Sequence, residues 1–306
     1  MVPVVALLDI AVLLLGPAAV VIALLVSAVA RSTRPVRSVV LVAAYAGVEL
    51  SLLPRVLRAD RDWDALLREV LARSYPILRS VLDVTVELEP GSATPEQVAT
   101  GHPLIVLSRH CGPGDSLFVA WLLSGHYRLR LGAVLKSALR LEPVVDLAGD
   151  HLPLCFVNRD RAGTRQRITG LAATLASGDA LLLFPEGGNF TWPRRRKAIR
   201  SLIAHGAYRR ARQARRSTHT LPPHTGGSAA ALTGAPTADV LVLTHSGFAA
   251  DGRNRPWWRL PVHTTLLVRT TLVPSVAVPR DEDALTDWLV DAWSTVDTWI
   301  AGHSTG

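Results

Sequence analysis

The sequence predicts an α/β protein whose sheet is flanked by helices and preceded by a hydrophobic helical segment that anchors the chain to a membrane. Three observations lead to this expectation. Short apolar runs alternate with helix-like stretches along most of the 306 residues, as in sheets covered on both faces. Residues 4–30 form one long apolar run. Charged residues make up only 19% of the chain, against about 25% in ordinary soluble domains.

The composition also excludes several classes of protein. Hydrophobic residues amount to 49% of the chain, so enough apolar surface is available for folding and whole-chain disorder is excluded. The two cysteines, Cys111 and Cys155, belong to no Cys-x-x-Cys motif or Cys/His cluster in the sequence. Neither a disulfide framework nor a zinc site is therefore expected.

The N-terminal apolar run is expected to be a membrane anchor. Residues 4–30 carry a single charge, Asp9, and exceed the roughly 20 residues that cross a hydrocarbon core. The alternative is a cleaved signal peptide ending near Ala28 and Ala30. Against it, no Lys or Arg precedes the run, which is longer than a signal-peptide core. Arginines at 31, 34 and 37 follow, so the positive-inside rule places the rest of the chain on the cytoplasmic side.

A second apolar segment, residues 39–53, is expected to lie at the membrane interface or to re-enter the bilayer. It contains Glu49 and is short for a span. The alternatives are a buried helix of the soluble domain, or a full crossing that would put the remaining chain outside the cell. The charged, helix-like residues 55–73 are expected along the membrane surface. The chain should thus divide into membrane-associated helices over residues 1–58 and a second domain over residues 75–306.

The second domain should contain the sheet. Strands are expected at residues 82–88, 103–107, 130–135, 180–184, 240–244 and 262–273, and helices at 116–123, 164–177, 194–214 and 228–233. A final helix is expected over residues 285–300, where apolar side chains recur at helical spacing and predict a core-packing face.

The positive charge of the chain is concentrated in one place. The net charge is +8, yet residues 194–216 contain ten basic residues and no acidic one, and without those ten the net charge would be −2. Because the positive charge is confined to one segment, a nucleic-acid-binding surface that extends over the whole protein is not expected. We expect one basic helix, closed by a loop at residues 221–227, that either lies on anionic lipid or is simply solvated.

The first motif with a chemical use is His110-x4-Asp115, which follows an expected strand and opens an expected helix. The tight turn between the two residues allows the carboxylate to reach Nδ1 of the imidazole, which leaves Nε2 as a general base. The alternative is that Asp115 only caps its helix and that His110 is an ordinary loop histidine.

Two further elements follow apolar runs. In Phe184-Pro185-Glu186-Gly187-Gly188, the glycines let backbone N–H groups approach a ligand and Glu186 can accept from a hydroxyl; the alternative is a β-turn with an exposed carboxylate. In Phe156-Val157-Asn158-Arg159, the guanidinium can bind a phosphate through two hydrogen bonds, although most surface arginines are only solvated. Arg161 is the competitor for that role.

Taken together, the three elements resemble the motifs of the glycerolipid acyltransferase family, which includes 1-acylglycerol-3-phosphate acyltransferases. The resemblance covers about residues 100–250. It implies that His110 and Asp115 are catalytic and that Arg159, Glu186, Gly187 and Gly188 bind the acceptor substrate. The sequence departs from the family at Gly188-Asn189, where Thr-Arg is common, and at Thr244-His245, where a proline is usual.

The resemblance implies transfer of a fatty acyl chain from acyl-CoA or an acyl carrier protein to the hydroxyl of a lysophospholipid. The expected acceptor is 1-acyl-sn-glycerol-3-phosphate, which would give phosphatidic acid. No metal, cofactor or nucleic acid is expected to take part. Two alternatives remain: a non-catalytic, membrane-anchored binding protein that uses the basic residues 194–216, and a lipid hydrolase that directs the His-Asp pair at water.

Overall fold

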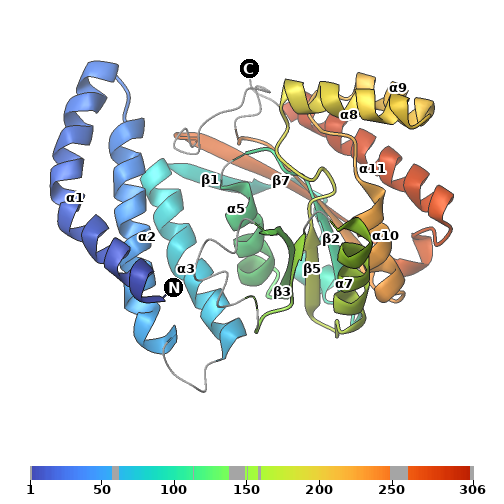
Figure 1. Cartoon of the computed structure of the whole chain (residues 1–306), viewed down its shortest axis with the longest axis horizontal. Coiled ribbons are helices and arrows are strands. Elements are labelled where there is room, and N and C mark those ends of the chain that lie inside the picture. The colour runs from blue at the N-terminus through green and yellow to red at the C-terminus, as the bar shows by residue number, and fades with distance from the viewer. Residues whose placement is uncertain are drawn as a thin grey trace.

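The computed structural model describes residues 2–56, 62–112, 114–137, 149, 151–157, 160–248 and 261–303, with the side chains of residues 2–5 and 161 excepted. Two long helices, α1 (Val2–Ala30) and α2 (Arg34–Val56), lie side by side at one end of the molecule. Helix α3 (Trp63–Leu82) connects them to a seven-stranded sheet covered by helices on both faces (Figure 1). The predicted α/β class is confirmed.

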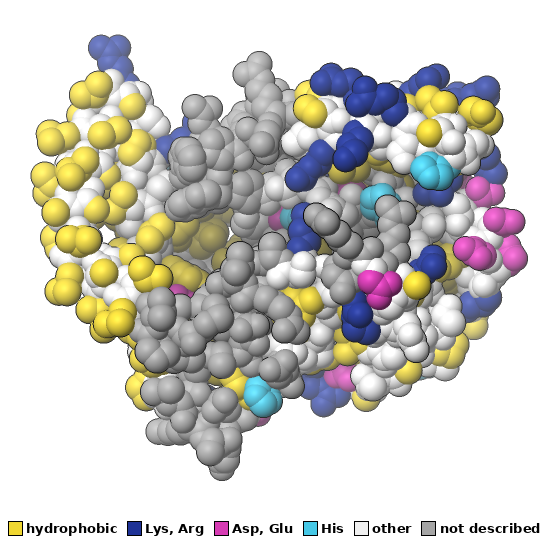
Figure 2. Space-filling model, viewed as in Figure 1, with side chains coloured by type: hydrophobic (Ala, Val, Ile, Leu, Met, Phe, Trp, Pro, Cys, Tyr) yellow, Lys and Arg dark blue, Asp and Glu magenta, His cyan; other side chains and the backbone are white. Residues whose placement is uncertain are grey.

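Helix α1 is continuous through Gly16 and Pro17 and presents its apolar side chains outward. Leu14 and Val29 are 76% and 88% exposed, and hydrophobic side chains cover this end of the molecule in Figure 2. By length and composition, α1 and α2 could each cross a membrane. An exposed apolar surface of this kind is typical of a lipid-facing helix.

Helix α2 corrects the expectation of a short second segment. It has 23 residues because polar residues outside the apolar run are also helical, from Arg34 at one end to Arg55 at the other. The Arg37 guanidinium donates to the hydroxyl of Thr33 at 3.1 Å and to the backbone carbonyl of Val81, which ties the start of α2 to the end of α3. A hydropathy pattern does not record polar contacts of this kind, so it underestimated the length of α2.

Helix α3 packs on both α2 and the sheet domain; the expectation that residues 55–73 lie along the membrane surface stays a prediction. It begins after Asp62, whose side chain accepts from the N–H of Ala65. Leu66 packs with Val48 and Leu52 of α2, while Tyr75 packs beneath the sheet. The expected boundary between residues 58 and 75 therefore overlaps α3, which packs both on α2 and on the sheet. The division into two domains stays a prediction.

The sheet has the strand order β1-β7-β6-β2-β5-β3-β4. All neighbouring strands are parallel except β6 and β7, which are antiparallel, so β1 and β7 run opposite to the other five. The strands are β1 (Val84–Leu88), β2 (Leu104–Ser108), β3 (Arg130–Lys136), β4 (Leu154–Val157), β5 (Asp179–Leu183), β6 (Asp239–His245) and β7 (Thr264–Val273). The six expected strands are present; β4 was missed because its four residues show no periodicity.

Alternating side chains of the central strands fill two cores. Leu104 and Val106 of β2 face α3 and α5 (Asp115–Trp121), whereas Ile105 and Leu107 face the opposite layer. That layer consists of α7 (Arg161–Ala173), α10 (Thr225–Gly234) and α11 (Glu282–His303) (Figure 1). With both faces covered, the strands are nearly continuous apolar runs. Short helices α4 (Pro95–Val98), η1 (Leu122–His126) and η3 (Ser275–Ala277) complete the described elements.

The expected single basic helix is two helices, α8 (Trp192–Ala204) and α9 (Tyr208–Arg216). The chain turns at Gly206, whose φ of +74° lies in the left-handed region that favours glycine. The expected loop at 221–227 is also too long, because α10 already begins at Thr225. Glycines in α10 allow it to lie close to α7, where the Thr169 hydroxyl donates to the carbonyl of Ala230 at 3.0 Å.

Candidate active site

The sequence motifs meet at one edge of the sheet. His110 follows the last residues of β2, Glu186 follows β5, and Lys136 and His245 end β3 and β6. These four strands are parallel to one another and lie in the consecutive order β6-β2-β5-β3. Their carboxyl ends therefore share an edge, which is where open α/β sheets carry their ligand sites.

His110 and Asp115 form a hydrogen-bonded pair. Nδ1 of His110 lies 2.9 Å from Oδ2 and 3.1 Å from Oδ1 of Asp115. The carboxylate also accepts from the backbone N–H groups of Cys111 at 2.7 Å and Gly112 at 3.1 Å. The carboxylate thus bonds the turn that precedes it, and Gly114 rather than Asp115 occupies the cap position of α5. Asp115 is therefore not the helix cap that the alternative proposed.

The electrostatics of the pair favour an ionised carboxylate. Asp115 is 1% exposed. Burial by itself would raise the pKa of Asp115, but the hydrogen bond and charge of His110, together with His245 and the N–H of Cys111, lower that pKa below its usual range. An ionised Asp115 accepts the Nδ1 proton and so leaves Nε2 as the lone-pair nitrogen. The side chain of His110 is 16% exposed and rests against Phe184, and no described residue hydrogen-bonds Nε2.

Glu186 is buried behind His110 instead of being exposed on a turn. It is 2% exposed, and its two carboxylate oxygens accept from the backbone N–H groups of His110 at 3.1 Å and Leu221 at 2.8 Å. Burial raises the pKa of Glu186 to about 7, against the opposing charge of Arg109. Both oxygens are occupied by the backbone, so the geometry fits a carboxylate that holds two loops together better than one that receives a substrate hydroxyl.

The two glycines after Glu186 differ in what they offer. Gly187 has a φ of +66°, and its N–H donates to the carbonyl of Phe184 at 2.9 Å, so that group closes the turn. Gly188 lies directly beneath two cations: a Cβ at this position would be 2.9 Å from Nη1 of Arg194 and 3.4 Å from Nζ of Lys136. A glycine here leaves room for both side chains.

Lys136 and Arg194 form a pair of like charges beside the candidate catalytic histidine. Burial, then the charge of Arg194, lowers the pKa of Lys136, while the charge of Asp115 acts in the other direction. Arg194 also donates to the carbonyl of Asn189 at 3.1 Å. Sequence reasoning missed both residues as site residues. Lys136 ends an expected strand, and Arg194 was one of many arginines in the basic run, so neither stood out.

Arg109 is a third cation that sequence reasoning missed, although it directly precedes His110. It is 1% exposed and donates to the carbonyls of His245 at 2.7 Å and His219 at 3.3 Å. Its charge lies close enough to Glu186 to oppose the effect of burial on that carboxyl. Arg109 thus connects β6, the loop before α10 and the turn that carries His110.

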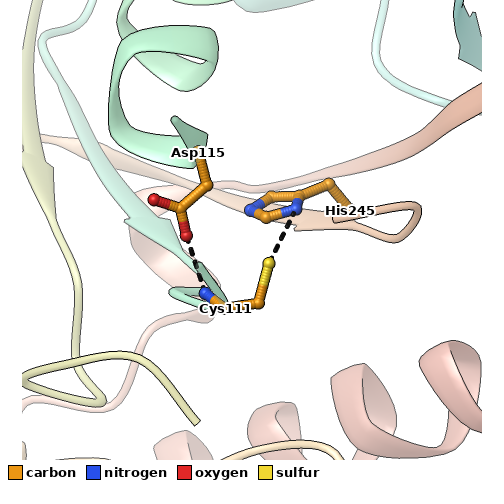
Figure 3. A group of neighbouring side chains, drawn as sticks. All are labelled: Cys111, Asp115 and His245. Carbon is orange, nitrogen blue, oxygen red and sulfur yellow. Dashed lines mark hydrogen bonds between the residues drawn. The ribbon is translucent and has the colours of Figure 1, made fainter. Parts of the chain in front are cut away.

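A buried cluster of Cys111, Asp115 and His245 lies behind the pair (Figure 3). The sequence shows no Cys/His cluster at Cys111, yet folding brings His245 to it across 134 residues, with Sγ and Nδ1 3.8 Å apart. The potential ligand atoms lie within 4.8 Å of one another, so we asked whether they would hold a metal ion.

The protonation states of the cluster do not favour a metal. Burial raises the pKa of the Cys111 thiol, whereas zinc requires a thiolate. Burial lowers the pKa of His245 to about 4, so this imidazole is neutral. Its Nε2–H donates to the carbonyl of Arg109 at 3.2 Å, and Asp115 is already engaged by His110. The cluster is accounted for as a hydrogen-bonded support behind Asp115.

The loop over residues 217–224 is fixed from both sides. On one side, Asp297 of α11 accepts from the N–H groups of Thr218 at 3.0 Å, His219 at 2.7 Å and Thr220 at 2.8 Å. On the other side, Leu221 donates to Glu186. The last helix of the chain is therefore connected through this loop to the backbone of His110.

Arg159, the expected phosphate ligand, lies outside the described residues. Strand β4 ends at Val157, and Asp160 caps α7 by accepting from Gly163 N–H at 3.0 Å. The backbone of Arg161 opens α7. The roles of Arg159 and Arg161 stay predictions.

The sequence model of the family described as Acyltransferase matches residues 92–244, which is half of the chain. The crystal structure of the 1-acyl-sn-glycerophosphate (LPA) acyltransferase PlsC from Thermotoga maritima is similar, with a TM-score of 0.54 and 15% sequence identity. The similarity covers 89% of this chain and 99% of that one, and at this identity it shows a shared fold. No curated protein matched the sequence.

Proposed function

This chain belongs to the acyltransferase family, and from that premise we propose that it transfers a fatty acyl chain from a thioester donor to the hydroxyl of a lysophospholipid. The proposed acceptor is 1-acyl-sn-glycerol-3-phosphate and the product phosphatidic acid. The single observation that carries the proposal is the His110–Asp115 pair, in which no described residue hydrogen-bonds Nε2 of His110 and two cations converge on Gly188.

In the proposed reaction, Nε2 of His110 removes the proton of the acceptor hydroxyl while that oxygen attacks the thioester carbonyl carbon. The C–S bond then breaks, the acyl chain remains on the acceptor oxygen as an ester, and the leaving thiolate takes the proton from the imidazolium. Asp115 fixes the tautomer of His110 and stabilises the imidazolium while it exists. Neither a covalent acyl-enzyme nor a metal ion is needed in these steps.

The acceptor phosphate would supply a negative charge between the cations of the site. Lys136 and Arg194 repel each other across Gly188, and a phosphomonoester with up to two negative charges would relieve that repulsion. We propose that these residues, together with Arg159, bind the phosphate and that the backbone at Gly188 lies against it. Arg194 would then replace the arginine that is common at the position of Asn189 in the third motif of the family. Guanidinium groups suit this role because they meet phosphate with two parallel hydrogen bonds.

The membrane location follows from the N-terminal helices. The exposed apolar side of α1 supports association with the bilayer from which a lysophospholipid would be taken. We propose that the sheet domain lies on the cytoplasmic side, because arginines at positions 31, 34 and 37 follow the first apolar run.

The test is turnover by the full chain purified in detergent. Acyl-CoA or a loaded acyl carrier protein is supplied with a panel of lysolipids, free thiol is measured, and the products are identified by mass spectrometry. Phosphatidic acid formed from the lysophosphatidic acceptor is the expected result. Thiol release that ignores the acceptor would identify a hydrolase instead, and an absence of thioester consumption would favour a binding protein.

A further inference from the structure

Helices α8 and α9 repeat one pattern of exposed side chains. Each helix begins with an aromatic residue, and arginines follow it four and eight positions later. These residues are Trp192, Arg196 and Arg200 in α8, and Tyr208, Arg212 and Arg216 in α9. All six are exposed, and residues four apart lie on one side of a helix. We call these two sets of residues the aromatic–basic rows.

The four arginines of the aromatic–basic rows have no counter-charge. Among the described residues, none of their guanidinium groups makes an ion pair or a hydrogen bond. Other arginines of the same helices do: Arg195 donates to the carbonyls of Ser217 at 2.6 Å and Arg215 at 2.7 Å, and Arg209 pairs with Asp287. The fold therefore uses part of the basic segment for structure and leaves the arginines of the rows available to a partner.

The aromatic rings that begin the rows are also exposed. Trp192 is 38% exposed and Tyr208 is 68% exposed. Outside α1 and α2, only two other large apolar side chains in the described part of the chain are as open to solvent, Val157 and Val276. Tryptophan and tyrosine are enriched at the level of lipid headgroups, and basic helices with exposed aromatic side chains are typical of membrane surfaces. A partner that recognised charge alone would leave both rings in water.

The aromatic–basic rows begin beside the candidate active site. The N–H of Phe190 donates to the carbonyl of His110 at 3.3 Å, and α8 starts two residues later. Arg194, in the first turn of α8, reaches Gly188. A surface that contacts the rows therefore lies next to the sheet edge that carries His110.

The face that carries these basic helices also carries apolar side chains of α1. Figure 2 shows the hydrophobic side chains of α1 and the Lys and Arg side chains over α8 and α9 on the same face of the molecule. The two groups lie toward opposite ends of the long axis (Figure 1). A bilayer that meets this face would contact α1 through apolar side chains and α8 and α9 through charge. An acidic protein or a nucleic acid would account for the arginines alone.

We propose that the aromatic–basic rows form a second membrane contact, selective for anionic lipid headgroups, which holds the sheet edge with His110 against the bilayer surface. Trp192 and Tyr208 lie at headgroup level, and the arginines meet lipid phosphates. Without the ten basic residues of positions 194–216 the net charge would be −2, so the preference for anionic lipid should depend on this segment. The inference goes beyond the proposed function, which places only the N-terminal helices at the membrane.

The first experiment measures how strongly the full-length chain prefers anionic vesicles. R200E/R212E reverses one arginine of each row, and R200K/R212K at the same positions is the control that keeps the charge. Partition into phosphatidylcholine vesicles is measured by cosedimentation, with and without phosphatidylglycerol. The ratio of the two partition coefficients is compared between proteins, because the apolar contribution of α1 cancels in that ratio.

We expect this ratio to fall at least about tenfold in R200E/R212E, because each arginine near an anionic surface contributes about fivefold. R200K/R212K should stay within about twofold of the wild type, since a headgroup layer responds to charge more than to guanidinium geometry. The ratio for the wild type should decline as the Debye length falls from about 30 Å to about 8 Å with added salt.

The second experiment places a polarity-sensitive fluorophore on Tyr208→Cys. Both natural cysteines, Cys111 and Cys155, are buried, so the introduced thiol is the accessible one. Its emission should shift to the blue with anionic vesicles, and the shift should be lost when R200E/R212E is added. The control is Ser177→Cys, an exposed position just before β5 at the opposite edge of the sheet from His110, where no shift is expected.

Three results would overturn the inference. The first is an anionic preference of R200E/R212E equal to that of the wild type, together with a label at position 208 that stays in water. The second is an equal loss in R200K/R212K, which would assign the arginines to a site that binds one phosphate through paired hydrogen bonds. The third is a shift of the label with a single-stranded oligonucleotide or an acidic protein but not with vesicles. None of these measurements needs turnover, so an inactive wild type would refute the proposed function and leave this test intact.

Discussion

At the scale of single residues, the proposed chemistry depends on His110 and its carboxylate partner. His110→Ala removes the general base and should lower kcat about 10²- to 10⁴-fold, and Asp115→Ala should have a similar or slightly milder effect. Initial rates with saturating donor and acceptor measure the loss, and circular dichroism and the melting temperature provide the control for folding. Activity of His110→Ala above about a third of the wild type would contradict the assignment.

Glu186 should act on turnover through position rather than through contact with the acceptor. Glu186→Gln presents an amide NH2 to one of two backbone donors, and losing a hydrogen bond to a charged group costs about 1.5–3 kcal/mol. We expect kcat to fall roughly tenfold or more at that cost, with the acceptor KM little changed. A higher acceptor KM at constant kcat would instead return Glu186 to the substrate-binding role expected from the sequence.

The same residue predicts a pH effect on stability. Burial raises the pKa of Glu186 from 4.5 to about 7 in the folded protein, so folding favours the protonated form. Its contribution to the free energy of unfolding is therefore fully present below about pH 4.5 and is lost as the pH rises through about 7. Melting temperatures across this range should decline less steeply for Glu186→Gln than for the wild type, and parallel curves would contradict the shift.

Arg159 and Arg161 can be separated by substitutions that keep the charge. Arg159→Lys removes the two parallel hydrogen bonds of the guanidinium and should raise the acceptor KM about tenfold or more, with the donor KM unchanged. Arg161→Lys is the matched control two residues away. Saturation curves for both substrates decide between them: a shift confined to Arg161→Lys would show that the neighbouring arginine binds the phosphate.

The site residues that the sequence revealed are those in local motifs. His110 and Asp115 are joined by one turn, so their spacing allows the contact, and the family resemblance made it the expected one. Lys136, Arg194, Arg109 and His245 gave no such signal, because their closeness to His110 depends on the strand order. His245, for example, reaches Cys111 only because β6 lies beside β2.

At the scale of elements, helix α11 is expected to support turnover from a distance. Asp297 accepts hydrogen bonds from three consecutive backbone N–H groups of the loop over residues 217–224, and the N–H of Leu221 in the same loop donates to Glu186. Asp297→Asn should remove at least one of them and lower kcat about tenfold, given about 1.5–3 kcal/mol for a bond to a charged group, while both KM values change little. Asp291→Asn, an exposed residue of the same helix, is the matched control.

A purely structural role for Asp297 would give a different pattern. The melting temperature would fall while kcat at permissive temperature stayed at the wild-type level. If Asp297 acts through Glu186, the double variant with Glu186→Gln should lose less activity than the two single effects combined, because both disturb one network. Fully additive losses would show that the two residues act independently.

Most elements could be predicted because the central strands are short apolar runs between helices. The errors have local causes. β4 is only four residues long, and Gly206 divides a continuous basic pattern into α8 and α9. The length of α2 depends on tertiary contacts such as that between Arg37 and Val81, which hydropathy does not register.

At the scale of the whole molecule, the apolar and the basic helices lie apart. Helix α1 lies at one end of the long axis, and α8 and α9 lie toward the other (Figures 1 and 2). The sheet edge with His110 is close to the start of α8, because the N–H of Phe190 donates to the carbonyl of His110 at 3.3 Å.

The exposed apolar side chains of α1 predict that membrane binding depends on this helix. Leu14 is 76% exposed on α1, and a charge at the centre of a lipid-inserted helix costs about 2.5–3.5 kcal/mol. Leu14→Lys should therefore reduce partition into vesicles about a hundredfold, as measured by cosedimentation at physiological ionic strength. Turnover of a detergent-dispersed acceptor should be unchanged, because the substitution is remote from His110. Binding of Leu14→Lys at the wild-type level would contradict a lipid contact along α1.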